Sequence, residues 1–330
     1  MTSAAILGCA GPVLGPGEAA FFREAAPWGF ILFARNIEDP GQIRRLTAAL
    51  RDAVGRDAPV FIDQEGGRVQ RLRPPHWRDW PAPLDQVLAA GADAPRAMEL
   101  RYRLIAADLR ALGIDANCAP TCDIAGPATH PFLHNRCLGL DAAAVAAAAR
   151  GAARGMLAGG VLPVIKHIPG HGRATADSHL SLPVVTTPLA ELEATDFAPF
   201  RALADLPMAM TAHVVYTALD PDLPATLSPA GIAAIRGGMG FDGLLMTDDM
   251  SMQALSGDLG ALTAQALAAG CDVALHCNGD RAEMAAVVAA AGPLHGVAAD
   301  RAAAALARRH APEEADLTAL ARDLAALADG

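Results

Sequence analysis

The stretch LPVIKHI, residues 162–168, decides the fold class that this sequence predicts. It is an almost unbroken apolar run that ends in two polar residues, Lys166 and His167. Such near-continuous runs are typical of parallel strands that are buried on both faces. In α/β proteins the chemistry lies at the carboxyl ends of the strands. The stretch therefore predicts a buried parallel strand that delivers two polar side chains to a site.

Seven further runs of this kind occur along the chain and alternate with helical stretches, among them 40–54, 140–160 and 228–240. The eight predicted strands are AAILGC (4–9), WGFILFA (28–34), PVFIDQE (59–65), DANCAPTCD (115–123), LPVIKHI (162–168), PMAMTAHV (207–214), GLLMTDD (243–249) and DVALHC (272–277). We expect one α/β domain over 1–330, a single (β/α)8 TIM barrel, with a motif-free helical tail from about residue 280. A doubly wound open sheet is the alternative, but no glycine-rich phosphate fingerprint supports it.

The composition excludes several classes of partner. The 330 residues carry a net charge of −10 and form no basic cluster, which disfavours nucleic acid and anionic membranes as partners. No charge-free apolar stretch of about 18 residues could span a bilayer, and the N-terminus lacks a secretory signal pattern. Six scattered cysteines without a CxxC pair suit reduced thiols. We expect a cytoplasmic protein, a monomer or weak homodimer, that acts on a small-molecule substrate.

Polar residues end five of the eight predicted strands, which indicates one shared site at the carboxyl end of the barrel. Each of them comes late in an otherwise apolar run. The residues are Asp63, Gln64 and Glu65 on the third strand, Asp123 on the fourth, Lys166 and His167 on the fifth, His213 on the sixth, and Asp248 and Asp249 on the seventh.

A polar loop follows the fifth strand within VIKHIPGHGRATADSHLSLP, residues 164–183. Residues 172–180 have small and polar side chains without apolar periodicity, which is typical of a mobile functional loop. Asp177 and His179 are two residues apart, so on an extended loop they point the same way. A carboxylate partner raises the pKa of an imidazole and suits it to general acid/base work. A solvated turn is the alternative reading.

The seventh strand, within GFDGLLMTDDMSMQA (240–254), carries two adjacent carboxylates. Neighbouring residues on a strand face opposite ways. One of Asp248 and Asp249 should therefore face the barrel axis, as a nucleophile or metal ligand, while the other should be structural.

Two further segments carry candidate ligand-binding residues. Asp63 and Arg71, eight residues apart, can offer an acceptor and a fork of donors to a polyhydroxylated ligand. Arg136 lies in the loop HPFLHNRCLG, where an arginine by itself usually faces solvent.

A catalytic metal is the less favoured reading. Metal-dependent hydrolases on this barrel use histidines and aspartates at strand ends. The first strand here offers no such ligand, and Pro169 and Gly170 break the pair His167 and His171. The other candidate ligands are His130, His134, His213 and Asp248. We expect no metal and no cofactor.

Five segments together resemble glycoside hydrolase family 3, and in particular its bacterial single-domain β-N-acetylglucosaminidases (β-hexosaminidases) of peptidoglycan recycling. The resemblance extends from about Gly29 to Gly279. The segments are IDQEGGRVQRL, HNRCLG, KHIPGHGRATADSH, MTAHVVYTALDPDLPATLSP and TDDMSM, in the family's order. The departures are HNRCLG, where relatives often have Phe and Ser, and Ile168 in place of the usual Phe.

The resemblance implies a single barrel and a retaining β-N-acetylglucosaminidase. It implies Asp248 as the nucleophile with Asp249 as its supporting neighbour, and His179 as the general acid/base with Asp177 as its partner. It also implies GlcNAc-1,6-anhydroMurNAc, with or without peptide, as the muropeptide substrate. The sugar-contacting positions that it implies are Asp63, Arg71, Arg136, Lys166 and His167.

Three other functions stay open at this point. The first is phosphorolysis, because a histidine acid/base carries no negative charge that would repel phosphate. The second is another β-glycosidase specificity at the same site. The third is a non-enzymatic muropeptide-binding barrel, which predicts damaged catalytic residues, whereas Asp248, His179 and Asp177 are all present.

Overall fold

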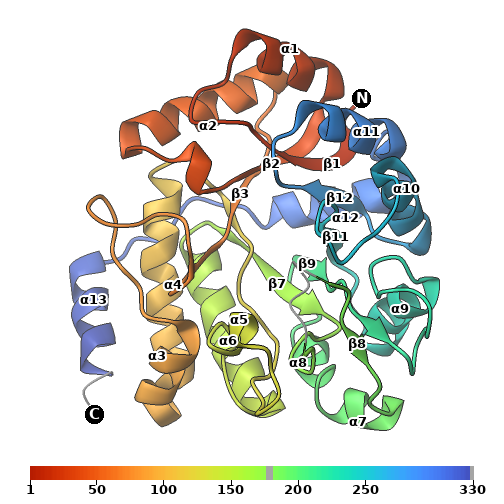
Figure 1. Ribbon diagram of the computed structural model, residues 1–330. Coiled ribbons are helices and arrows are strands. Elements are labelled where there is room, and N and C mark those ends of the chain that lie inside the picture. Colours follow the sequence, from red (N-terminus) through yellow and green to blue (C-terminus); the bar gives the residue numbers. More distant parts are fainter. Residues whose placement is uncertain (176–180, 328–330) are drawn as a thin grey trace.

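Eight parallel strands close into a barrel in the computed structural model, which describes residues 1–175 and 181–327 (Figure 1). Each of the eight predicted runs overlaps one barrel strand, so the predicted (β/α)8 barrel is confirmed. In order around the barrel, the strands are β1 (Ser3–Gly8), β12 (Val273–His276), β11 (Leu244–Asp249), β9 (Met208–Thr211), β7 (Leu162–Ile168), β6 (Ala116–Asn117), β3 (Val60–Ile62) and β2 (Pro27–Leu32).

Helices surround this barrel and connect its strands (Figure 1). In chain order they are α1 (Pro16–Ala25), α2 (Pro40–Val54), α3 (Pro83–Ala90), α4 (Ala94–Arg110), α5 (Pro131–His134), α6 (Ala142–Ala158), α7 (Leu189–Ala194), α8 (Ala198–Ala202), α9 (Pro229–Ala233), α10 (Leu259–Ala269), α11 (Arg281–Ala291), α12 (Gly296–Ala307) and α13 (Leu317–Ala326).

The three helical stretches predicted from the sequence are helical in the structure, and each begins directly after its capping residue. The predicted helix 40–54 coincides with α2, whose N-cap Asp39 accepts a hydrogen bond from the backbone N–H of Gln42. The predicted helix 140–160 is α6, capped by Asp141. The stretch 228–240 begins as α9 after the cap Ser228, and it continues as a π-helical turn over Ala234–Gly238 rather than as one regular helix.

The fourth strand is shorter than predicted, because regular strand pairing covers only Ala116–Asn117 of the predicted 115–123. Pro120 has no backbone N–H to contribute to the ladder. The segment nevertheless stays beside β7, since the N–H of Cys122 donates to the carbonyl of Lys166 at 2.6 Å and the N–H of Lys166 donates to the carbonyl of Pro120 at 3.1 Å. Asp123 therefore still reaches the carboxyl end of the barrel.

Two apolar layers hold the barrel together. The interior is filled by inward-facing side chains such as Ile6, Phe61 and Met208, and Ala302 and Ala305 of α12 belong to the same buried cluster. The outward faces of the strands pack against the surrounding helices and form the larger cluster. This filled interior leaves the carboxyl end of the barrel as the place for a site.

The long connections at that end carry small elements of their own. After β3 the chain forms a hairpin of β4 (Gln64–Gly66) and β5 (Val69–Gln70), and β8 (Val184–Val185) pairs with β10 (Val215–Tyr216). Figure 1 shows α13, the last helix of the described chain, lying alongside α4. Within the described residues no helix has the length and apolarity needed to cross a bilayer, and all six cysteines are buried and free.

Candidate active site

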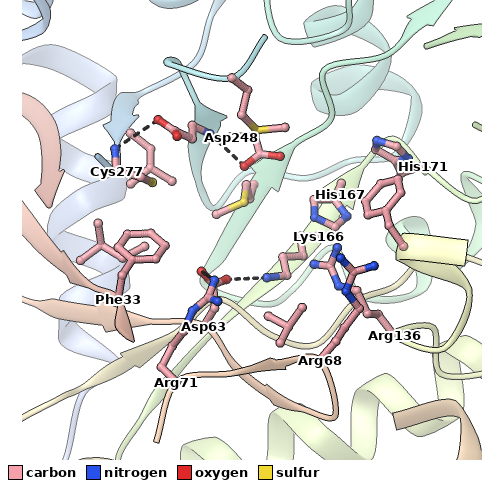
Figure 2. A pocket seen from close by; sticks show the side chains of 17 residues that line it. Phe33, Asp63, Arg68, Arg71, Arg136, Lys166, His167, His171, Asp248 and Cys277 are labelled. Atoms are coloured by element: carbon pink, nitrogen blue, oxygen red, sulfur yellow. Dashed lines mark hydrogen bonds and ion pairs between the residues drawn. The ribbon is translucent and has the colours of Figure 1, made fainter. Parts of the chain in front are cut away.

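A pocket of about 320 Å³ opens at the carboxyl ends of the barrel strands. Residues at the ends of the third, fifth and seventh predicted strands meet at this pocket, whereas Asp123 and His213 of the fourth and sixth strands do not line it. Six of the residues that the sequence predicts for a site line the pocket: Asp63, Arg71, Arg136, Lys166, His167 and Asp248. Figure 2 shows them with side chains directed toward one cavity. Asp177 and His179, the two proposed acid/base residues, lie outside the described residues.

Asp248 and Asp249 have the different environments that the strand pattern predicts. Met246 points into the barrel interior, and Asp248, two residues later, lines the pocket on the same side. Asp248 Oδ1 accepts a hydrogen bond from the Asp249 N–H at 2.8 Å. The Asp249 carboxylate also borders the pocket, but it accepts hydrogen bonds from the Ser251 hydroxyl and from the N–H groups of Ser251 and Cys277, at 2.8 to 3.1 Å. Asp249 therefore holds the end of the strand, while Asp248 faces the ligand space.

The Asp248 carboxyl is held in its ionised form. Burial alone would raise its pKa, but the nearby His213 and His167, the Asp249 N–H and Lys166 together lower the pKa below the ordinary aspartate value. An ionised carboxylate that faces a pocket can attack an electrophilic carbon.

Lys166, the single lysine of the chain, lies between two carboxylates and is only 2% exposed. Its Nζ is 2.7 Å from Asp63 Oδ1 and 2.7 Å from Glu65 Oε1. Asp63 Oδ2 also accepts from Arg71 Nη2 at 3.2 Å. Burial would raise the pKa of Asp63, but Lys166 and Arg71 outweigh burial and hold that pKa well below its usual range. The cluster is therefore charged and offers N–H donors and carboxylate acceptors to a polar ligand.

Glu65 holds two cations of the pocket, a role that the sequence did not predict. It was noted at the end of the third predicted strand but was given no role. Its carboxylate forms a bidentate pair with Arg136, at 2.9 Å to Nε and 2.8 Å to Nη2, and it also holds Lys166. Arg136, which by sequence alone would face solvent, is buried because this pair neutralises it. The signal was available in the acidic residue of IDQEGG, two positions after Asp63.

The lowered pKa of Glu65 gives a testable pH dependence. Burial raises this pKa, but Arg136 and Lys166 lower it to about 2. An unfolded glutamate titrates at about 4.3, so Glu65 contributes stability above that pH and loses it as the pH falls toward 2. Urea unfolding of Glu65→Gln between these pH values should therefore show a pH slope smaller than wild type by about 1.4 kcal/mol per pH unit. An unchanged slope would contradict this charge state.

A second buried pair orients His167. Its Nδ1 lies 2.7 Å from Asp123 Oδ2, and the other carboxylate oxygen accepts the N–H of His171 at 2.6 Å. Burial alone would raise the pKa of Asp123, but His167 and His171 outweigh burial and lower it. The carboxylate is therefore ionised and accepts a hydrogen bond from the Nδ1–H of His167. The other ring nitrogen of His167 is then available to a ligand. Burial and the neighbouring His167 lower the pKa of His171 to about 4.

His213 supports the strand end that carries Asp248. Its Nε2 is 3.0 Å from the carbonyl oxygen of Asp249, and its Nδ1 is 2.8 Å from Thr226 Oγ1. Because a carbonyl oxygen only accepts hydrogen bonds, Nε2 carries the proton. Burial lowers the pKa of His213 below the ordinary histidine value, although the nearby Asp248 opposes this effect.

No group of three or more histidines, cysteines, aspartates or glutamates that could hold a metal ion occurs in residues 1–175 and 181–327. The chemistry available from the described residues is that of a charged pocket with ionised carboxylates, among them Asp63 and Asp248, several N–H donors and an apolar side. That apolar side includes Phe33, Met252 and Leu275.

Comparisons with known proteins identify the family of this chain. Residues 26–308 match the model of the glycosyl hydrolase family 3 N terminal domain. A curated Pseudomonas aeruginosa protein named "Beta-hexosaminidase" is 39% identical over 297 residues, which cover 88% of this chain and 86% of that protein.

Two solved structures are similar over nearly the whole chain. One is a glycoside hydrolase family 3 β-N-acetylglucosaminidase from Paenibacillus sp., with a TM-score of 0.86 and 31% identity, covering 98% of this chain and 67% of that one. The other is NagZ from Neisseria gonorrhoeae in complex with N-trifluoroacetyl-D-glucosamine, with a TM-score of 0.80 and 28% identity, covering 100% and 99%. The barrel, the pocket at its carboxyl end and the match over residues 26–308 together show that this chain belongs to glycoside hydrolase family 3.

Proposed function

We propose that this enzyme is a retaining exo-β-N-acetylglucosaminidase that removes a terminal β-linked GlcNAc from its substrate. The proposal is supported by relatives named "Beta-hexosaminidase" and by the glucosamine derivative bound in the Neisseria gonorrhoeae structure. The observation that carries it is the ionised Asp248 carboxylate facing a pocket lined with donors that suit a polyhydroxylated ring.

In the first chemical step, Asp248 attacks the anomeric carbon of the bound sugar. A bond forms between the carboxylate oxygen and that carbon, while the bond from the carbon to the leaving-group oxygen breaks. His179, charged and supported by Asp177, donates its proton to the departing oxygen. The products are a covalent glycosyl-enzyme and the free alcohol.

In the second step, neutral His179 accepts a proton from water as the water attacks the same carbon. Asp248 leaves as a carboxylate, and the sugar is released with its original configuration because two displacements have occurred. Placing the acid/base on the 172–180 loop and the nucleophile on β11 lets the loop serve both steps.

The proposed sugar contacts follow from the charges in the pocket. Arg71 and Lys166 would donate to hydroxyl oxygens, Asp63 would accept from a hydroxyl group, and Arg136 and His167 would contact the hydroxyl and N-acetyl groups. Glu65 would act through Arg136 and Lys166 as a positioning residue, since its carboxylate is 1% exposed and already holds both of them.

The finer proposal concerns the natural substrate. We propose GlcNAc-1,6-anhydroMurNAc, with or without its peptide, as the compound cleaved, and cell-wall recycling in the cytoplasm as the process served. This assignment rests on the resemblance of five segments to the peptidoglycan-recycling branch of the family and on the relatives that match nearly the whole chain.

Hydrolysis of 4-nitrophenyl β-N-acetylglucosaminide, compared with the β-glucoside, tests the proposed specificity. We expect turnover of the N-acetylglucosaminide, little turnover of the glucoside, and the same rate with and without inorganic phosphate. Faster turnover of the glucoside would point to another β-glycosidase. Formation of a sugar 1-phosphate would establish phosphorolysis, and no turnover of either glycoside would favour a binding protein.

The assignment of His179 predicts a dependence on the leaving group. His179→Ala should slow cleavage of a disaccharide by at least about a hundredfold, because its alkoxide leaving group needs a proton. The same variant should lose much less on a 4-nitrophenyl substrate, whose leaving group departs unprotonated. Steady-state rates on both substrates measure the difference, and equal losses would show that His179 is not the acid.

A further inference from the structure

Arg68 is a cation in the pocket that the proposed chemistry does not use. It lines the same cavity as Asp248, from the turn between β4 and β5, but its side chain is exposed. Figure 2 shows Arg68 and Arg136 on one side of this view, with Phe33 and Cys277 on the other side. Because its side chain is exposed, Arg68 lies at the edge of the pocket, whereas Lys166 and Arg136 are buried.

Each of the other fixed cations of the pocket is already paired with a carboxylate. Arg71 pairs with Asp63, Lys166 with Asp63 and Glu65, and Arg136 with Glu65. Over residues 1–175 and 181–327, the Arg68 guanidinium has no ion pair or hydrogen bond. Within that part of the chain, the guanidinium group of Arg68 is thus an unpaired cation that a ligand at the pocket entrance could contact.

The backbone that carries Arg68 is fixed from below. Gly66 and Gly67 have φ values of 105° and 58°, which favour glycine, and a Cβ on Gly66 would collide with the Arg101 guanidinium. The N–H of Gly67 donates to the carbonyl of Trp80 at 2.9 Å, and Arg73 Nη2 donates to the carbonyl of Gly67 at 3.0 Å. These contacts hold the backbone of the turn in place. None of them involves the side chain of Arg68.

We propose that Arg68 binds a carboxylate on the leaving-group part of the substrate, and so forms a subsite for acidic aglycones. The inference rests on the proposed exo-glycosidase function, in which the terminal sugar fills the buried end of the pocket and the aglycone extends through its mouth. A guanidinium fork matches a carboxylate in geometry and charge. The chain has a net charge of −10, so an anionic substrate needs a local cation at the entrance to offset the repulsion.

Three substrates with wild type and Arg68→Gln test this subsite. The first is GlcNAc linked β-1,4 to 1,6-anhydroMurNAc, whose lactyl group carries the carboxylate. The second is the methyl ester of the same disaccharide, and the third is 4-nitrophenyl β-N-acetylglucosaminide. We expect Arg68→Gln to lower kcat/KM for the free acid about tenfold, mainly through KM, because a charge-assisted contact is lost. The ester and the aryl glycoside should be unaffected.

The control is Arg44→Gln, which removes the same charge from an exposed position of α2 outside the pocket. This variant should keep the wild-type preference for the acid, and Arg68→Lys should restore part of it. Equal losses on all three substrates, or a wild type that cleaves acid and ester equally well, would overturn the proposal.

A measurement with inorganic phosphate tests whether Arg68 binds phosphate and not a carboxylate of the substrate. A rate enhancement by phosphate that disappears in Arg68→Gln would show that this side chain serves phosphate and would overturn the aglycone subsite. Failure of the proposed function has a different signature, because wild type would then cleave none of the three substrates.

Discussion

Replacing Asp248 with alanine should lower kcat for 4-nitrophenyl β-N-acetylglucosaminide by about 10⁵-fold, as loss of a nucleophile does in other hydrolases. The carboxylate has no substitute, since Asp249 is occupied by Ser251 and Cys277. The fold should survive, because Asp248 lines the pocket and is not part of the apolar core. Its neighbours hold its pKa below the ordinary value, so the carboxylate contributes some stability at pH 7, and we expect an unfolding temperature slightly below that of wild type.

Two comparisons make this result specific to the nucleophile. Added azide should restore turnover of Asp248→Ala and yield the α-glycosyl azide, because the small anion attacks the face that the carboxylate has vacated. Asp249→Asn, which keeps an oxygen for Ser251 and Cys277, should lose far less activity and should produce no glycosyl azide. The opposite pattern would assign the nucleophile to Asp249.

Replacing Lys166 with methionine should destabilise the fold by about 3–5 kcal/mol at pH 7, the range for breaking a buried ion pair. The Nζ atom lies between Asp63 and Glu65, and its loss leaves the two carboxylates repelling each other in a buried site. Urea unfolding measures the change. The loss should shrink at low pH, where protonation of the carboxylates removes the repulsion.

The control for Lys166 is Arg154→Met, which removes the cation of an exposed pair with Glu99. Surface pairs contribute about 1 kcal/mol or less, so this variant should stay close to wild type. Similar losses for the two variants would contradict the charged cluster. Lys166→Met should also weaken binding of N-acetylglucosamine, since one donor of the pocket disappears.

The barrel could be predicted because each strand has a local sequence pattern that indicates it. Runs such as GLLMTDD are apolar on both faces and end in polar residues. Strand geometry predicts that one of Asp248 and Asp249 faces the interior, and the resemblance to the family implies that it is Asp248. The fourth strand was harder to delimit, because Pro120 interrupts regular pairing while the segment keeps its hydrogen bonds to β7.

The pairings between site residues could not be predicted in the same way. Glu65 and Arg136 are 71 positions apart, and no local pattern in either segment predicts that they form a bidentate ion pair. The same is true of Asp123 and His167, which lie 44 positions apart. The positions of these strand-end residues follow from the barrel, whereas their partners depend on side-chain packing across it.

Trapping the covalent intermediate tests the central claim most directly. A 5-fluoro derivative of β-N-acetylglucosaminyl fluoride should inactivate the enzyme, because the ring fluorine slows both displacements while the fluoride leaving group keeps the first one fast, so that the covalent intermediate accumulates. Mass spectrometry of the digested protein should then find one added sugar, on Asp248. A label on Asp249, Asp63 or Glu65, or turnover of the reagent without any adduct, would contradict the account.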